Sequence, residues 1–142
     1  MTGERDLHKV FLGLGSNLGH REENIRKAIS LIGERVGLVI RQSSLIETEP
    51  WGFESKNKFL NGVILCDTAL TPRQVLKATQ KIERELGRKT KTSHASRLYH
   101  DRPIDIDILI YDDLIVDEPD LKIPHPLMHE RDFVMIPLKE IK

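Results

Sequence analysis

The apolar positions of this chain follow strand spacing in some segments and helix spacing in others. Compact apolar runs or strict alternation predict strands over residues 10–14, 38–47, 59–68 and 104–111. From residue 23 onward the apolar residues recur every three or four positions. That spacing predicts an amphipathic helix, which buries Ile25, Ala28, Ile29, Ile32 and Val36.

A second predicted helix has the clearest start signal in the chain. Thr71 is a good N-cap, Pro72 occupies the first helical position, and Gln74 completes a capping box. Gly87 is suited to end this helix, because glycine readily adopts the left-handed conformation that follows a helix C-terminus. The predicted buried stripe consists of Val75, Leu76, Thr79, Ile82 and Leu86.

The segments between these elements lack a period. Residues 48–57 and 88–102 are predicted loops, and Ile123-Pro-His-Pro126 is a turn, because proline disfavours a helical residue before it. Residues 133–138 are expected to form a short strand or a helical turn. The order βαββαβ predicts a single α+β domain over residues 1–142. Its ferredoxin-like, mostly antiparallel sheet is expected to carry two helices on one face.

Composition narrows the class of protein without naming it. Lys plus Arg and Asp plus Glu each total 22 among 142 residues, so the formal net charge is zero. A nucleic-acid or membrane-surface binder is usually basic, so neither partner is expected. No apolar run exceeds four residues, and the N-terminus has no apolar stretch of a signal peptide. The single cysteine is compatible with the reducing cytoplasm, where we expect the protein to reside.

Asp105 and Asp107 are the first candidates for chemistry. On a strand, side chains two residues apart share a face, with Cα atoms roughly 6.5 Å apart. Two carboxylates this close repel each other, so nearby arginines or a hard divalent cation such as Mg²⁺ should neutralise them. The alternative is an edge strand with an ordinary solvated face. The pattern alone does not decide between these two interpretations.

The predicted loop before this pair is strongly basic. Over residues 88–102 it holds Arg88, Lys89, Lys91, His94, Arg97, His100 and Arg102. Taken alone, such a loop is more often a solvated surface. Because it leads directly to the carboxylate pair, we favour a site for a polyphosphate carried with Mg²⁺.

Three other patterns carry less information. Gln80 and Glu83 lie one helical turn apart and could face a ligand, although most such pairs are solvated. His125 and His129 have a His-x-x-x-His spacing that suits zinc only on a helix, and the flanking prolines argue against one. The glycines of residues 13–19 do not match a dinucleotide fingerprint. A P-loop and the protein-kinase motifs are missing, so ATP chemistry needs another scaffold.

Together these residues resemble a known family, the 6-hydroxymethyl-7,8-dihydropterin pyrophosphokinases of folate biosynthesis. The matching segments occur in the family's order and cover nearly the whole chain. They are residues 14–18 (LGSNL), 47–52 (ETEPWG), 59–61 (FLN), 80–88 (QKIERELGR), 102–109 (RPIDIDIL), 123–126 (IPHP) and 131–133 (RDF). The family transfers pyrophosphate from ATP to the hydroxymethyl group of the pterin and releases AMP.

The resemblance implies roles for named residues. Asp105 and Asp107 would hold two Mg²⁺ ions, and Arg97 and Arg102 would stabilise developing negative charge. The residues implied on the ATP side are Gln80, Glu83, Arg88, His125 and Arg131. Those implied on the pterin side are Thr48, Pro50, Trp51, Phe59, Asn61 and Phe133. Of these, Phe59 and Phe133 would stack on the flat ring and Asn61 would hydrogen-bond its polar edge.

Two interpretations from other classes compete with this one. A ferredoxin-like binding domain would hold a small ligand without chemistry, and it would need neither the aspartate pair nor the basic loop. A metal-dependent phosphodiesterase would also use the aspartate pair, but it would release product without a pterin. Pterin-dependent formation of AMP from ATP separates all three.

Overall fold

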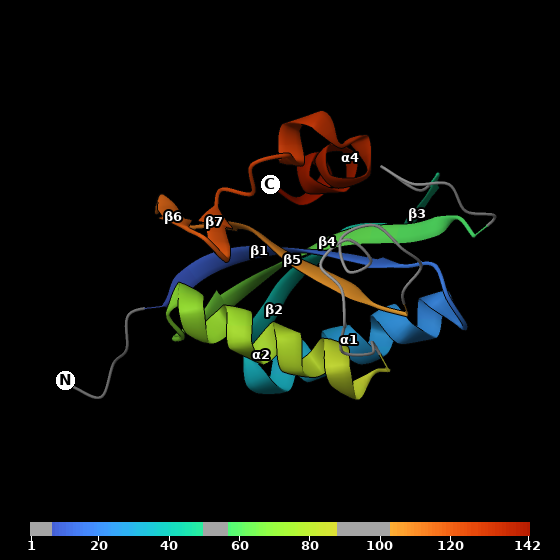
Figure 1. Cartoon of the computed structure of the whole chain (residues 1–142), viewed down its shortest axis with the longest axis horizontal. Helices are drawn as coiled ribbons and strands as arrows, with labels where there is room; N and C mark the ends of the chain where they lie inside the picture. Colours follow the sequence, from blue (N-terminus) through green and yellow to red (C-terminus); the bar gives the residue numbers. More distant parts are fainter. Residues whose placement is uncertain (1–6, 50–56, 88–102) are drawn as a thin grey trace.

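The computed structural model describes residues 7–49, 57–87 and 103–142 of this chain. A central antiparallel sheet lies between two helices on one side and a third helix on the other (Figure 1). In chain order the elements are β1 (His8–Ser16), α1 (Arg21–Arg35), β2 (Gly37–Gln42), β3 (Ile46–Thr48), β4 (Phe59–Thr68), α2 (Pro72–Glu85), β5 (Asp105–Tyr111), β6 (Val116–Glu118), β7 (Leu121–Ile123), the 3₁₀ turn η1 (Met128–Glu130) and α4 (Asp132–Ile141).

The sheet confirms the predicted ferredoxin-like core. Its strands lie in the order β2-β4-β1-β5, and every pairing is antiparallel. The short strand β3 pairs with the first residues of β4, on the same edge of β4 that pairs with β2 further along. Strands β6 and β7 form a separate hairpin. Strand β1 is therefore the central strand between β4 and β5.

The predicted strand over residues 38–47 is in fact two strands. The pairing of β2 with β4 shifts register between Val39 and Arg41, and the chain leaves the ladder after Gln42. Ser43 then bonds to the backbone of Val63 through both its own N–H and its hydroxyl group, at 2.9 and 2.8 Å. A side-chain hydroxyl thus replaces a ladder contact and separates β2 from β3, which the apolar pattern alone did not reveal.

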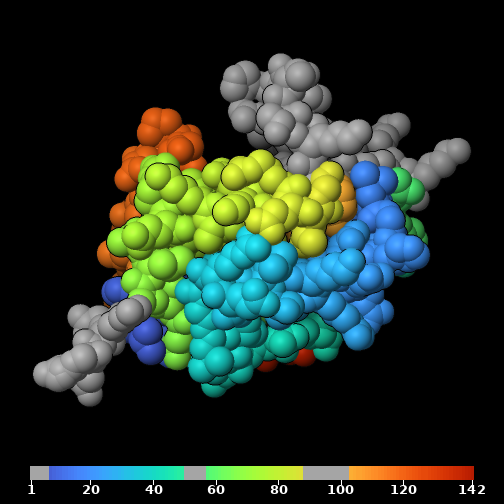
Figure 2. Space-filling view, turned by 90° about the horizontal axis from the view of Figure 1, so that it is seen from below, coloured from blue at the N-terminus to red at the C-terminus, as the bar shows by residue number. Residues whose placement is uncertain are grey.

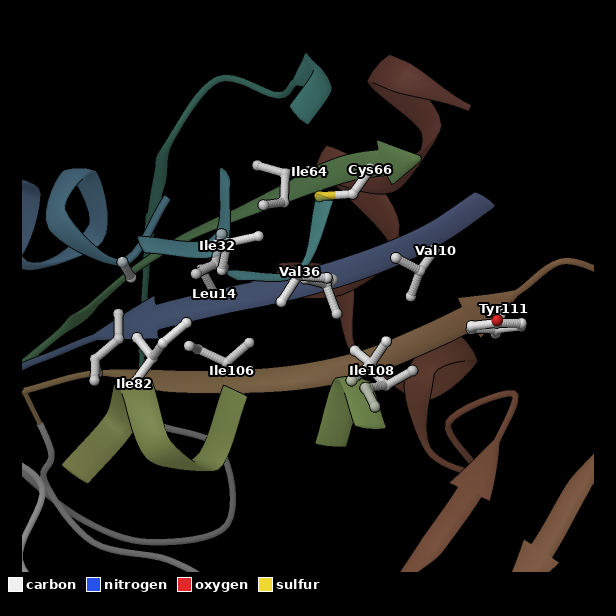
Figure 3. Packing of buried hydrophobic residues seen from close by; sticks show 14 of the residues in the cluster. Val10, Leu14, Ile32, Val36, Ile64, Cys66, Ile82, Ile106, Ile108 and Tyr111 are labelled. Carbon is white, nitrogen blue, oxygen red and sulfur yellow. The ribbon is translucent and has the colours of Figure 1, made fainter. Parts of the chain in front are cut away.

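One face of the sheet carries the main hydrophobic core. Helices α1 and α2 lie side by side over this face (Figure 2). Figure 3 shows Ile32 of α1, Ile82 of α2 and Ile106 of β5 among the side chains gathered between the two layers. Burial of these apolar side chains, each contributing roughly 1.5–3 kcal/mol, is the main source of stability.

A bulge breaks the predicted alternation of β5. Leu12 of β1 pairs with Ile108, whereas the preceding Phe11 pairs with Ile110, so Leu109 is an extra residue. Ile110 therefore packs on the face opposite the main core, and Tyr111 turns into that core. The strict alternation predicted over residues 104–111 would put Ile110 on the face of Ile106 and Ile108, and it was wrong there because a single extra residue reverses the alternation.

Helix α4 covers the other face of the sheet. Its residues Val134, Leu138 and Ile141 pack with Val63, Leu65 and Leu109 in a second, smaller core. The segment was expected to be a short strand or a helical turn, and it forms a helix of ten residues. Pro137 inside the helix hid this pattern, because proline is unfavourable at an interior helical position.

The C-terminal end of α4 is bound to the segment between β2 and β3. Arg41 donates from Nη1 to the carbonyl oxygen of Ile141 at 2.8 Å. The Ser44 amide donates to both carboxylate oxygens of Glu140, and the Ser44 hydroxyl lies 2.9 Å from Oε2. These contacts hold α4 across β4.

Within the described ranges, no helix is long and apolar enough to cross a membrane.

The capping box at the start of α2 gives a first prediction. The Thr71 hydroxyl accepts from the Gln74 amide at 3.2 Å, and Gln74 Oε1 accepts from the Thr71 amide at 2.9 Å. Thr71→Ala removes one of these bonds and should lower the free energy of unfolding by about 1 kcal/mol. Urea unfolding followed by circular dichroism measures this change. Lys77→Ala on the exposed face of the same helix is the control, and equal stability of the two variants would contradict the prediction.

Candidate active site

The central strand has no side chains along part of the face that α4 covers. Gly13 pairs with Asp107 of β5 and with Val63 of β4, and Gly15 pairs with Asp105 and with Asn61. Directly paired residues of antiparallel strands point to the same face. The two glycines therefore give a strip of backbone without side chains of its own, which we call the glycine strip. It separates the carboxylates on β5 from Asn61 on β4 by two strand spacings, roughly 9.5 Å.

Asp105 and Asp107 form one side of this strip. Both are partly exposed, on the face opposite the buried residues Ile104, Ile106 and Ile108. The backbone N–H of Ile106, between the two aspartates, donates to Oε2 of Glu83 at 2.7 Å. Glu83 on α2 is itself buried. This bond fixes the backbone of β5 where it carries the carboxylate pair.

Asn61, Phe59 and Thr48 form the opposite side of the strip. Thr48 pairs with Phe59 across β3 and β4, so both side chains share the face of Asn61. The Asn61 side chain is 5% exposed, and its Nδ2 donates to Oγ1 of Thr48 at 2.6 Å. This arrangement places an aromatic ring beside an oriented amide, which suits a flat polar ligand.

His125 and Arg131 come from the segment that leads into α4, and Phe133 lies in the first turn of that helix. The His125 amide donates to the carbonyl oxygen of Leu109 at 2.9 Å, which anchors this segment to β5. The Arg131 guanidinium carbon lies 5.5 Å from the centre of the Phe133 ring, within the range of a cation–π contact.

The His125 ring has a defined protonation pattern. Its Nδ1 accepts from the Leu127 amide at 3.3 Å, so the neutral ring carries its proton on Nε2. Burial lowers the pKa of His125 below its ordinary value, the positive charge of Arg131 lowers it further, and the charge of Asp105 acts in the opposite direction. His125 is therefore an uncharged Nε2–H donor near neutral pH, within electrostatic reach of Asp105.

The structure places most of the described candidate residues around one face of the sheet. Gln80 is exposed on α2, and its contact with ATP stays a prediction. Glu83 holds the β5 backbone, a role that the sequence did not suggest. His129 is exposed on η1, and within the described part of the chain no three His, Cys, Asp or Glu side chains gather to hold a metal. Five candidates lie outside the described residues: Pro50, Trp51, Arg88, Arg97 and Arg102.

Sequence reasoning missed the glycine strip. Gly13 and Gly15 were considered as part of a possible nucleotide fingerprint, which they do not match, and Gly15 also as part of the segment 14–18 that resembles the family. The signal was nevertheless present, because glycines at alternate positions of a strand leave one face of that strand bare. Side chains of the neighbouring strands approach this backbone instead, Leu109 at Gly13 and Asn61 with Phe59 at Gly15.

The fold and site define a class: a ferredoxin-like α+β domain with a carboxylate pair facing an aromatic and amide wall. Comparison with known proteins gives the family. The family model described as 7,8-dihydro-6-hydroxymethylpterin-pyrophosphokinase (HPPK) matches residues 11–142, and the chain belongs to this family.

Several relatives cover most of the chain, and each is called 2-amino-4-hydroxy-6-hydroxymethyldihydropteridine pyrophosphokinase. The protein from Porphyromonas gingivalis is 48% identical over 133 residues, which are 93% of this chain and 89% of that protein. The Aquifex aeolicus protein is 41% identical, over 94% of this chain and 79% of its own length. The Bacillus subtilis protein is 38% identical, over 93% of this chain and 77% of its own length.

Solved structures agree on the fold. Plasmodium falciparum HPPK-DHPS wild type matches with a TM-score of 0.74 at 16% identity, over 98% of this chain. The same protein carrying A437G, with SDX-DHP, also gives a TM-score of 0.74. The chain spans about two fifths of the length of these structures, 42% in both cases.

The surroundings of His125 give a second prediction. In the metal-free protein its NMR titration midpoint should lie below 6.5, the ordinary value for histidine. Asp105→Asn should lower the midpoint further, because it removes the charge that favours the imidazolium. Arg131→Gln should raise it, because it removes a repelling charge. A midpoint above 6.5, or shifts of the same sign in both variants, would contradict this arrangement of the three side chains.

Proposed function

We propose that this chain transfers the pyrophosphoryl group of ATP to the hydroxymethyl group of 6-hydroxymethyl-7,8-dihydropterin, giving AMP and the pterin diphosphate in folate biosynthesis. Family membership supports this activity. The structural observation that carries it is the glycine strip, with the carboxylate pair on one side and the Asn61–Phe59 wall on the other. A flat alcohol and a polyphosphate can meet over this strip.

We assign the pterin to the wall formed by β3, β4 and α4. Phe59 and Phe133 would stack on the two faces of the ring, and Asn61, held by Thr48, would hydrogen-bond its polar edge. Pro50 and Trp51 would complete this side of the site. Aromatic faces and one buried amide suit a planar heterocycle with several N–H groups.

We assign the phosphates of ATP to the side of the site that includes β5 and α4. Arg131 and the Nε2–H of His125 would donate to phosphate oxygens, and Gln80 and Glu83 would lie on the nucleotide side. For Glu83 this role comes in addition to its bond to Ile106. Arg88, Arg97 and Arg102 would add positive charge from the basic segment.

We further propose that Asp105 and Asp107 hold two Mg²⁺ ions that accompany ATP. The donor chemistry fits, because Mg²⁺ in proteins takes one or two carboxylates and completes its coordination with phosphate oxygens and water. When bound, Mg²⁺ would supply charge neutralisation at the phosphates. Glu83 would contribute indirectly, by fixing the backbone between the two carboxylates.

The proposed reaction is a displacement at the β-phosphorus. The pterin hydroxyl oxygen forms a bond to that phosphorus, and the bond from the phosphorus to the oxygen bridging the α-phosphate breaks. That oxygen keeps the electron pair and leaves as part of AMP, and the hydroxyl proton passes to solvent. The side chains around the strip would align the two substrates and exclude water from them. No strong general base is required, which agrees with the uncharged His125 being a hydrogen-bond donor.

The carboxylate pair gives the test of this function. Purified protein with ATP, Mg²⁺ and the reduced pterin should form AMP only when the pterin is present. Asp105→Asn and Asp107→Asn should each lower this turnover at least a thousandfold, about 4 kcal/mol of transition-state stabilisation. Both variants should fold, because each keeps the shape of the side chain and relieves charge repulsion.

Asp113→Asn is the matched control, because Asp113 is exposed in the turn after the same strand. It should keep the activity of the parent. AMP formed without pterin would favour a phosphodiesterase, and ligand binding without AMP would favour a binding domain. Activity within tenfold of the parent in either aspartate variant would remove that residue from the proposed catalytic set.

The stacking wall gives a separate prediction. Phe133→Ala should weaken pterin binding by roughly ten- to a hundredfold, since stacking of a flat ring is worth about 1–3 kcal/mol. ATP binding should change little. Calorimetry with an unreactive ATP analogue and Mg²⁺ measures both affinities, and Ile136→Ala on the exposed side of α4 is the control. Equal losses of ATP and pterin binding in a folded Phe133→Ala protein would contradict the assignment.

A further inference from the structure

Gly15 lies directly beneath the Asn61 amide. A Cβ atom added to Gly15 would be 2.8 Å from Oδ1 of Asn61 and 3.4 Å from Cδ1 of Phe59. The first distance is shorter than a carbon and an oxygen tolerate without movement. Two residues earlier on the same strand, a Cβ added to Gly13 would be 3.5 Å from the nearest atoms of Leu109, which is an ordinary contact.

The Asn61 side chain has little freedom to move away. It is 5% exposed, and its Nδ2 donates to Oγ1 of Thr48 at 2.6 Å. Because Nδ2 is turned to Thr48, Oδ1 is turned to the glycine strip. A methyl group on residue 15 would therefore push on the amide oxygen, and the amide could turn only by giving up its bond to Thr48.

We propose that Gly15 determines specificity at the pterin position, an inference that rests on the proposed function. By having no side chain, Gly15 leaves Oδ1 of Asn61 over the strip as a hydrogen-bond acceptor for a ring N–H group. A ligand without that N–H leaves a buried acceptor unpaired and is rejected. Gly15 acts through Asn61, as a positioning residue for its amide.

A double-mutant cycle tests this coupling. The proteins are the parent, Gly15→Ala, Asn61→Ala and the variant carrying both changes, with pterin affinity measured by calorimetry in the presence of an unreactive ATP analogue and Mg²⁺. Gly15→Ala should weaken pterin binding at least tenfold. In the Asn61→Ala background the same change should have less than a twofold effect, because the amide that it displaces is gone.

Two comparisons make the result specific to this contact. Gly33→Ala, on the open face of α1 outside the site, should leave pterin affinity within twofold of the parent. ATP affinity should stay within twofold of the parent in Gly15→Ala. Discrimination is the ratio of the affinities for the pterin and for an analogue methylated at the N–H groups of its polar edge. This ratio should fall at least tenfold in Gly15→Ala. Gly33→Ala should leave it unchanged.

The outcomes separate the two proposals. If the parent forms AMP with the pterin but Gly15→Ala binds and discriminates as the parent does, this inference is wrong and the proposed function stands. Equal losses from Gly15→Ala in both backgrounds would also overturn it. If Gly15→Ala fails to fold, a folded double variant with the affinity of Asn61→Ala supports the contact, and an unfolded one refutes it. A parent that neither binds pterin nor forms AMP overturns the proposed function itself. In that case the contact is tested by the NMR resonances of the Asn61 side-chain amide. If Gly15→Ala does not shift these resonances, the contact is refuted.

Discussion

Gly13 and Gly15 lie on β1, the strand that joins the two halves of the sheet, because β1 pairs with both β4 and β5. A central strand is normally packed through its own side chains, whereas β1 has none at these two positions, and Leu109 and Asn61 approach its backbone instead. The backbone there is still fully engaged in the sheet, so the glycine strip is rigid. The candidate side chains around this strip come from the strands on either side, Asp105 and Asp107 from β5 and Asn61 from β4.

The two faces of the sheet differ in what they carry. Helices α1 and α2 cover one face and enclose the larger core, which includes Ile32, Ile82 and Ile106. The other face carries the candidate site and a smaller core under α4. Glu83 connects the two, because it reaches from α2 to the backbone between Asp105 and Asp107. The stable face thereby fixes the geometry of the functional one.

The sequence predicted those parts of the structure that depend on local spacing. The cap of α2, the bounds of β4 and the ferredoxin-like order follow from residues close together in the chain. What it did not predict depends on contacts between distant residues. The bulge at Leu109 is set by pairing with β1, and the break after Gln42 is set by a bond to Val63. The buried role of Glu83 likewise needs β5 beside α2, which no periodicity reveals.

The attachment of α4 has a consequence for inhibitors. Its far end is held by Arg41 and by the pairing of Ser44 with Glu140, contacts outside the main core. A compound that relies on Phe133 contacts α4. Substitutions at Arg41, Ser44 or Glu140 can shift this helix while the sheet stays folded. A compound that relies on Asn61 and the backbone of Gly15 contacts groups held by the ladder between β1 and β4, which does not depend on the position of α4. The second kind leaves fewer routes to resistance.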